Sequence, residues 1–109
     1  MPPKRLLFLC SRNRLRSPTA EAIFAEYPGV EADSAGLSPD ADLRLSAEQV
    51  EAADLIFVME TVHRQRLQKN FGKLLAGKKV VVLGIPDDYE FMDPALVELL
   101  KLRCAPYLK

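Results

Sequence analysis

The sequence predicts a three-layer α/β protein, in which a four-stranded parallel sheet carries helices on both faces. Segments 6–9, 55–59 and 79–83 are short apolar runs typical of buried strands, and 30–34 is predicted as a further short strand. Helical segments separate the strands, and no hairpin signal joins any two of them. Strands that alternate with helices form right-handed βαβ units and therefore a parallel sheet. With 109 residues, 49% of them hydrophobic, we expect one domain over residues 1–109.

The predicted helices begin at capping residues, and the first and third end where glycine or proline follows. Ser17-Pro18 begins the first helix, which continues to Tyr27, and Ser46 caps a short second helix that ends at Ala53. The third helix covers 61–71 and ends at Gly72, and the fourth begins at Asp93-Pro94 and runs toward Pro106. Segments 35–43 and 84–92 are predicted loops that follow the second and fourth strands.

Composition and charge exclude several classes of protein. Fifteen basic and fifteen acidic residues give zero net charge, so we expect no general attraction to nucleic acid. No apolar run approaches the roughly 18 residues of a membrane span, and the first apolar stretch is too short for a signal peptide. Two cysteines make no disulfide framework, and no Cys/His cluster has metal-ligand spacing, so no metal or cofactor is expected. A cytoplasmic protein of unspecified oligomeric state follows as the default.

The segment from Cys10 to Ser17 carries the chemistry. Five residues separate Cys10, which closes the first strand, from Arg16, which precedes a helix start. A loop of that length can curl so that successive backbone N–H groups point at an anion, and the helix N-terminus favours the thiolate that makes cysteine a nucleophile. The residues expected to bind the substrate phosphate in this way are Ser11, Arg12, Asn13, Arg14 and Leu15.

Arg16 and Ser17 complete the predicted phosphate site. The Arg16 guanidinium can make two parallel hydrogen bonds to phosphate oxygens, which a lysine ammonium cannot match. Ser17 is placed to donate a hydrogen bond to the Cys10 thiolate, which also helps that group to leave. The alternative is a buried cysteine at a strand end with arginines on the surface. The preceding strand, the following helix and the adjacent basic charge favour the phosphate site.

The leaving oxygen of a phosphate ester needs a proton, and a carboxylic acid in a loop facing the nucleophile can supply it. Asp87 and Asp88 follow the fourth strand, whose carboxyl end opens on the same sheet edge as Cys10. Aspartate is also common in turns, which is the alternative role for both residues. Asp93, which precedes Pro94, is interpreted as a helix N-cap.

Several stretches resemble the low-molecular-weight protein tyrosine phosphatases. The family signature is a hydrophobic strand, Cys, five residues with Asn third, Arg-Ser-Pro and then Ala-Glu, and 6–24 is similar to it. Segment 33–36 resembles the end of the family's second strand, and segment 53–59 resembles its third strand. The resemblance implies the strand order 2-1-3-4 and a left-handed backbone at Asn13, which bonds toward Ser34 to fix the loop. Asp87-Asp88-Tyr89 resembles the family's Asp-Pro-Tyr, so it implies that Asp87 is the acid, with Asp88 second, and that Tyr89 walls the site.

The chain departs from the family pattern at four places. Arg12 stands where the family usually has glycine, and Arg14 where it has an apolar residue. Leu15 replaces a second cysteine, so a disulfide within the loop is impossible. The long segment after the second strand is cut to roughly Leu37–Arg44, which removes most of the wall that flanks a phosphotyrosine ring.

The resulting hypothesis is a cysteine-dependent phosphomonoesterase that works through a phosphocysteine. Its substrate would be a phosphorylated protein, with a phosphotyrosine protein as one candidate, or a small phosphomonoester, and phosphate and vanadate would inhibit it. A thiol-dependent arsenate reductase and a non-catalytic phosphate- or phosphopeptide-binding module are the alternatives. An arsenate reductase needs resolving cysteines, and only Cys104, which is expected in the core, is available. A binding module needs no acid, so the predicted acid at Asp87 argues against it. His63 and its basic neighbours Arg64, Arg66 and Lys69 are expected to face solvent.

Overall fold

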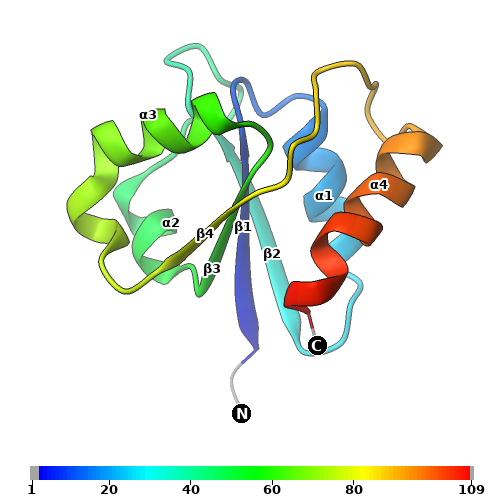
Figure 1. Cartoon of the computed structure of the whole chain (residues 1–109), viewed down its shortest axis with the longest axis horizontal. Coiled ribbons are helices and arrows are strands. Elements are labelled where there is room, and N and C mark those ends of the chain that lie inside the picture. Colours follow the sequence, from blue (N-terminus) through cyan, green and yellow to red (C-terminus); the bar gives the residue numbers. More distant parts are fainter. Residues whose placement is uncertain (1–2, 109) are drawn as a thin grey trace.

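The computed structural model describes residues 3–108, and a four-stranded parallel sheet lies at its centre (Figure 1). Its strands are β1 (Lys4–Cys10), β2 (Val30–Gly36), β3 (Leu55–Val58) and β4 (Lys79–Val82). They lie in the order β2-β1-β3-β4, and all three pairings are parallel. The predicted fold class and strand order are therefore confirmed. Residues 1, 2 and 109 of the predicted domain lie outside the described residues.

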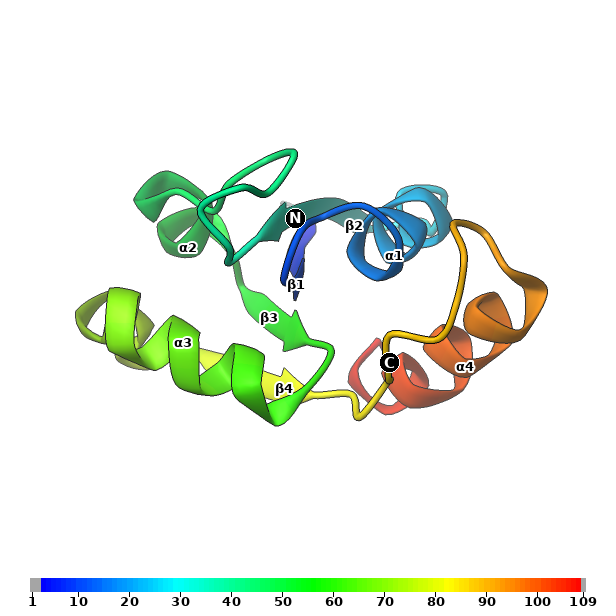
Figure 2. The same cartoon turned by 90° about the horizontal axis from the view of Figure 1, so that it is seen from above.

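Helices cover both faces of this sheet. They are α1 (Arg16–Phe24), α2 (Ala47–Ala52), α3 (Thr61–Phe71) and α4 (Pro94–Cys104), with 3₁₀ turns at Gly72–Leu75 and Ala105–Tyr107. Figures 1 and 2 show α1 and α4 together on one face and α2 and α3 on the other. Between residues 3 and 108, none of the helices has the length and apolarity needed to cross a membrane.

Two hydrophobic clusters pack against the sheet, one on each face. Alternate residues of β1 belong to the two clusters. Leu6, Phe8 and Cys10 pack in the cluster under α1 and α4, and Leu7 and Leu9 pack in the cluster under α2 and α3. The Phe8 ring stacks on the rings of Phe24 and Phe57, at centroid distances of 5.4 and 5.0 Å. This packing fixes β1 in the middle of the molecule and so holds Cys10 at the carboxyl edge of the sheet.

Some of the predicted element boundaries differ from those in the structure. β2 extends through Ala35 and Gly36, which were predicted as loop, because Leu9 and Cys10 of β1 pair with them. α1 ends at Phe24 rather than Tyr27, and α4 ends at Cys104 before a 3₁₀ turn. The predicted start of α1 was also wrong, since its N-cap is Leu15 and no side chain caps it.

Two predicted caps are present. The Ser46 hydroxyl accepts a hydrogen bond from the Gln49 backbone, while the Gln49 side chain accepts one from the Ser46 backbone, so the two form a capping box. The Asp93 carboxylate accepts a hydrogen bond from the Ala95 backbone at the start of α4, and Pro94 follows it. Asp93 is thus the N-cap of α4, as predicted.

Candidate active site

The loop between β1 and α1, residues 10–17, lies at the carboxyl edge of the sheet, and we call it the phosphate loop. β1 pairs with β2 on one side and β3 on the other, so the loop sits where the chain connections diverge, which is the usual ligand position in such sheets. The loops after β2 and β4 open on the same edge (Figure 1). A cavity of about 270 Å³ opens at the loop, and its lining residues are Cys10, Ser11, Arg12, Arg14, Leu15, Arg16 and Asp87.

Cys10 is buried, and its Sγ lies 2.9 Å from the Oγ of Ser17. The Asn13 amide donates to that same Ser17 oxygen at 2.9 Å, which leaves the Ser17 hydrogen to point at sulfur. This explains the wrong N-cap prediction, because the Ser17 hydroxyl serves Cys10 instead of the helix end. A hydroxyl that donates to sulfur stabilises a thiolate there.

Asn13 has φ 56°, and its amide also donates to Ser34 Oγ at 2.9 Å. The left-handed conformation and the hydrogen bond implied by the family resemblance are both present in the structure. Ser34 in turn donates to the Glu21 carboxylate on α1. Glu21 was not among the residues predicted for the site, although it follows Ser17 by four residues and therefore shares its helix face.

Arg16 makes its side-chain hydrogen bonds through one nitrogen. Its side chain is buried, and Nη1 donates to Glu60 Oε1 at 2.5 Å and to the Ile85 carbonyl at 2.8 Å. Both hydrogens of Nη1 are used in this way. Across the part of the chain that the structure describes, no hydrogen bond takes Nε or Nη2, the edge that grips a phosphate bidentately. Glu60 also balances the buried guanidinium charge.

Replacing Arg16 by lysine should lower kcat/KM on an aryl phosphate by about 10–100-fold, the size expected for losing hydrogen bonds to a charged group. The ammonium keeps the charge but cannot bond Glu60, Ile85 and phosphate with the same planar geometry. Steady-state kinetics measure the effect. Arg64→Gln is the matched control, because it removes a nearby arginine from the exposed face of α3. Equal losses in the two variants would contradict the assignment of Arg16.

His63 was predicted to face solvent, and that prediction is wrong: its side chain is 1% exposed. It lies in the first turn of α3, where Nδ1 accepts a hydrogen bond from the Glu60 backbone and Nε2 lies 3.1 Å from Ser11 Oγ. Burial and the nearby Arg16 charge lower the pKa of His63 to about 4. The burial of His63 was not predicted because the residues around it are polar. Arg64, Arg66 and Lys69 do face solvent, as expected.

The guanidinium groups of Arg12 and Arg14 pair with acidic residues of the loop after β2. The Arg14 Nε donates to Asp42 at 3.1 Å, and an Arg12 nitrogen lies 3.6 Å from Asp40. All four side chains are about half exposed, so each pair contributes little to stability by itself. Three backbone hydrogen bonds strengthen the contact, since the N–H groups of residues 37, 38 and 42 donate to the carbonyls of residues 10, 11 and 12. The shortened segment therefore packs directly on the phosphate loop.

Gly36 makes this close packing possible, and Gly36→Ala should lower the free energy of unfolding by about 1–3 kcal/mol. A Cβ at that position would lie against Ala41 and 2.7 Å from the Ser11 carbonyl oxygen, so one of the two loops must move. Denaturant unfolding measures the loss. Gly72→Ala is the matched control, because nothing lies within 4 Å of its added methyl group. A stability loss of equal size in both variants would contradict the steric explanation.

Asp87 lies at the mouth of the cavity, in the segment between β4 and α4. Its Oδ1 is 3.6 Å from Arg16 Nε, and its side chain is 65% exposed. The segment is held at both ends, because the Ile85 backbone donates to the Met59 carbonyl and the Met92 backbone donates to Thr19 Oγ1. Of the sequence-predicted residues in this segment, Asp87 is the one that the cavity includes.

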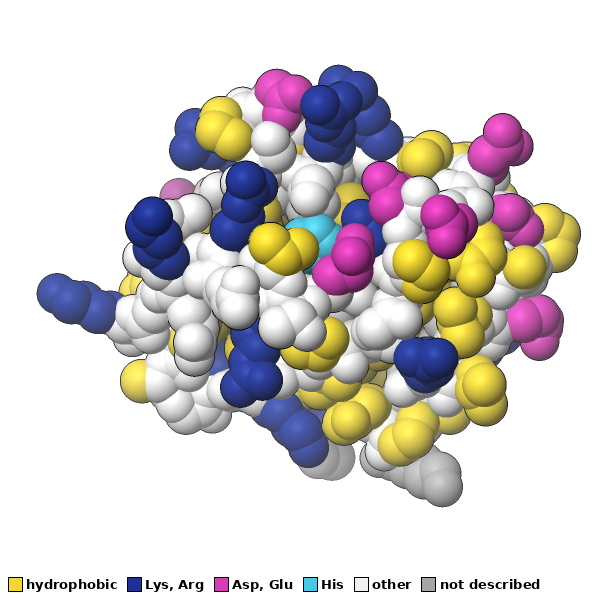
Figure 3. Space-filling model, turned by 45° about the horizontal axis from the view of Figure 1, so that its top comes forward, with side chains coloured by type: hydrophobic (Ala, Val, Ile, Leu, Met, Phe, Trp, Pro, Cys, Tyr) yellow, Lys and Arg dark blue, Asp and Glu magenta, His cyan; other side chains and the backbone are white. Residues whose placement is uncertain are grey.

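Asp88 and Tyr89 lie outside the cavity lining. Asp88 is exposed, and Tyr89 is half-buried against the hydrophobic cluster under α1 and α4. Figure 3 looks onto this side of the molecule and shows acidic side chains on one side of the histidine and basic side chains on the other. Among residues 3–108, no group of three or more His, Cys, Asp or Glu side chains is placed to hold a metal ion.

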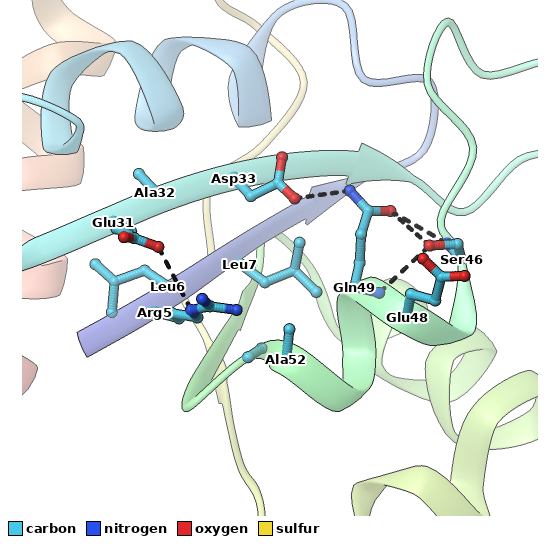
Figure 4. Close-up of a pocket in the computed structure, with 11 residues that line it drawn as sticks. Arg5, Leu6, Leu7, Glu31, Ala32, Asp33, Ser46, Glu48, Gln49 and Ala52 are labelled. Atoms are coloured by element: carbon cyan, nitrogen blue, oxygen red, sulfur yellow. Dashed lines mark hydrogen bonds and ion pairs between the residues drawn. The ribbon is translucent and has the colours of Figure 1, made fainter. Parts of the chain in front are cut away.

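A second hollow of about 270 Å³ lies at the other end of the sheet, where α2 meets the first halves of β1 and β2 (Figure 4). The helix α2 beside it has six residues. Four of its polar side chains are paired, Arg5 with Glu31 at 3.4 Å and Gln49 with Asp33 at 2.9 Å. Its lining contains no cysteine, and the Ser46 hydroxyl in it caps α2.

Comparisons with known proteins were made by sequence and by structure. No family model and no curated protein matches the sequence. Solved structures do match, among them the YwlE arginine phosphatase in a variant with a phosphorylated active-site serine. That structure is 28% identical, with a TM-score of 0.72, and the match covers 95% of each chain.

Two more distant structures share the same fold. The tyrosine phosphatase Wzb from Escherichia coli K30, in complex with phosphate, is 20% identical with a TM-score of 0.76, and the match covers 95% of each chain. The low-molecular-weight protein tyrosine phosphatase SP-PTP from Streptococcus pyogenes is 17% identical with a TM-score of 0.79, covering 96% of this chain and 91% of that one.

This chain has the α/β fold of solved phosphatases, with the phosphate loop at the carboxyl edge of its sheet. Its structural neighbours are low-molecular-weight protein tyrosine phosphatases, so the resemblance noted in the sequence is confirmed. These neighbours are hydrolases, and a cysteine-based phosphatase mechanism is supported at the level of the family.

Proposed function

We propose that this chain hydrolyses phosphate monoesters through a phosphocysteine formed on Cys10. The observation that carries the proposal is the surroundings of that thiol. Ser17 lies 2.9 Å from the sulfur, and Arg16 and Asp87 line the same cavity as Cys10. A nucleophile, an oxyanion clamp and a proton donor are the groups that phosphoryl transfer to and from cysteine requires.

In the first step the Cys10 thiolate attacks phosphorus, an S–P bond forms and the P–O bond to the leaving group breaks. The loop N–H groups bind the non-bridging oxygens, and Arg16 binds them through Nε and Nη2. The Asp87 carboxylic acid gives its proton to the leaving oxygen, which departs as a neutral alcohol or phenol.

In the second step a water molecule attacks the phosphocysteine. The Asp87 carboxylate, left by the first step, takes a proton from that water, an O–P bond forms and the S–P bond breaks. The Ser17 hydroxyl donates to the departing sulfur, so the thiolate is a better leaving group. Inorganic phosphate is released, and Cys10 and Asp87 return to their starting states.

The substrate class is a phosphorylated protein or a small phosphomonoester. The cavity is open to solvent at Asp87, and the segment after β2 folds back on the phosphate loop instead of rising as a wall. One neighbour's name specifies arginine and another's tyrosine, so phosphoarginine and phosphotyrosine are the two side chains to compare. A cytoplasmic setting fits the free thiol at Cys10.

The test is hydrolysis of an aryl phosphate, a phosphotyrosine peptide and a phosphoarginine peptide by the native chain. We expect turnover of the aryl phosphate, with phosphate and vanadate as competitive inhibitors, because both occupy the same loop. An inactive native chain that still binds vanadate would favour the binding-module alternative. An active enzyme indifferent to vanadate would place the chemistry at a different site.

Arsenate reduction is the less favoured enzyme function. It needs a second thiol to resolve the arsenate adduct on Cys10, and Leu15 removes the position within the loop. Cys104 is fully buried in α4, and burial raises its pKa to about 12. With a dithiol as the reductant, the native chain should release no arsenite above the rate of the Cys10→Ser variant.

A further inference from the structure

The first turn of α3 contacts both ends of the phosphate loop. His63 reaches Ser11, the residue after the nucleophile, at 3.1 Å, and Glu60 reaches Arg16, the last residue before Ser17, at 2.5 Å. The two contacts are linked, because the Glu60 backbone N–H donates to His63 Nδ1 at 3.0 Å. Neither Glu60 nor His63 has a role in the chemical steps described above.

These hydrogen bonds determine the tautomer of His63. A backbone N–H can only donate, so Nδ1 must present a lone pair to it, and the neutral ring then carries its hydrogen on Nε2. Nε2–H therefore donates to Ser11 Oγ. Because Ser11 accepts at this contact, its own hydrogen remains available to another acceptor, and Ser11 lines the cavity with Cys10.

We propose that His63 is a positioning residue, which in its neutral Nε2–H form turns the Ser11 hydroxyl so that it donates to an oxygen of the bound phosphate. The proposal rests on the proposed function only in taking that anion to be the substrate phosphate. The same imidazole holds the Glu60 backbone from which the Glu60 side chain extends to Arg16. His63 thereby orients the Ser11 hydroxyl at the start of the phosphate loop. It also supports Glu60, which holds the Arg16 guanidinium at the end of the loop.

The surroundings of His63 keep the ring neutral. Burial favours the neutral ring most, and the charges of Arg16 and Arg66 add to it, while Glu60 and Asp87 act in the opposite direction. Protonation would place a hydrogen on Nδ1 against the Glu60 N–H, so the ion cannot keep both hydrogen bonds. With the pKa lowered to about 4, the unfolded chain binds more protons than the folded one between about pH 6.5 and 4. Stability should therefore fall as the pH drops through that range, and oxyanion binding should show no histidine titration above pH 5.

Two conservative substitutions separate the two hydrogen bonds. In His63→Gln the side-chain amide nitrogen reaches the place of Nε2, and in His63→Asn the amide oxygen reaches only the place of Nδ1. We expect His63→Asn to weaken vanadate inhibition about tenfold, the usual size for one hydrogen bond to a charged group, and His63→Gln to retain most of it. Arg64→Gln, on the exposed side of the same turn, should leave inhibition unchanged.

The Ser11→Ala background tests whether His63 acts through Ser11. Ser11→Ala should weaken vanadate about tenfold, and adding His63→Asn should weaken it little further, because the two changes remove one interaction. Nitrogen-15 spectra of the native chain at pH 6–8 should show the Nε2–H tautomer. Equal losses in His63→Gln and His63→Asn, full additivity with Ser11→Ala, or a charged ring above pH 6 would each overturn the proposal. A native chain that binds vanadate without turnover would refute the phosphatase function alone.

Discussion

Replacing Cys10 by serine should abolish turnover of an aryl phosphate while phosphate binding stays close to that of the native chain. An alcohol is not ionised near neutral pH, so the nucleophile is lost. The anion site remains, because it consists of loop N–H groups and the free edge of Arg16. The Asn13 amide keeps its hydrogen bonds to Ser17 and to Ser34, so the loop should hold its shape.

Steady-state kinetics and phosphate titration of the same preparations test this expectation. Cys104→Ala is the matched control, because it removes the other thiol from the core of α4 and should lower stability without removing turnover. An arginine phosphatase variant has been solved with a phosphorylated active-site serine, so intact-mass measurement should also look for a stalled phosphoserine at residue 10. Near-native hydrolysis by Cys10→Ser would show that the nucleophile lies elsewhere.

The parts of the site that are local in sequence were predictable. Cys10 is placed by an apolar strand and Arg16 by a helix start, and five residues between them suffice for a loop. The position of Asp87 follows from parallel topology, since it comes after a strand whose carboxyl end lies at the same edge. The hydrogen bond from Asn13 to Ser34 joins two strand ends that the family resemblance had already brought together.

The parts that depend on contacts distant in sequence were missed. Glu60 is 44 residues from Arg16, and nothing in the run Glu60–Arg66 distinguishes an acid that pairs with a buried guanidinium from a surface acid. His63 shows the same limit: its ring is buried because the first turn of α3 lies against the phosphate loop. A polar helix sequence does not reveal that packing.

The arginines at positions 12 and 14 show how a shortened segment changes a loop. The sequence predicted both arginines as part of the phosphate site, and both residues line the cavity. Their guanidinium groups instead pair with Asp40 and Asp42 in the segment after β2, which is short enough to fold back on the phosphate loop. An acidic pair in a predicted loop carries no signal for which basic residues it will meet.

Asp87→Asn should lower turnover of substrates with poor leaving groups by roughly 10²–10⁴-fold, the range that general acid catalysis supplies. An amide of the same shape cannot give a proton to the leaving oxygen. An activated aryl phosphate should lose less, because its leaving group departs with little protonation. The physical basis is the place of Asp87, which shares the cavity of Cys10 and lies 3.6 Å from Arg16 Nε.

The neighbouring aspartates provide the controls that make this leaving-group dependence specific. Asp88→Asn should be mild, because Asp88 is exposed and outside the cavity lining. Asp93→Asn should be milder still, because Asp93 caps α4 and asparagine caps a helix about as well as aspartate. The three variants are compared on one good and one poor leaving group. A large dependence at Asp88 with none at Asp87 would move the acid one residue along the chain, and no dependence in any variant would mean that water protonates the leaving group.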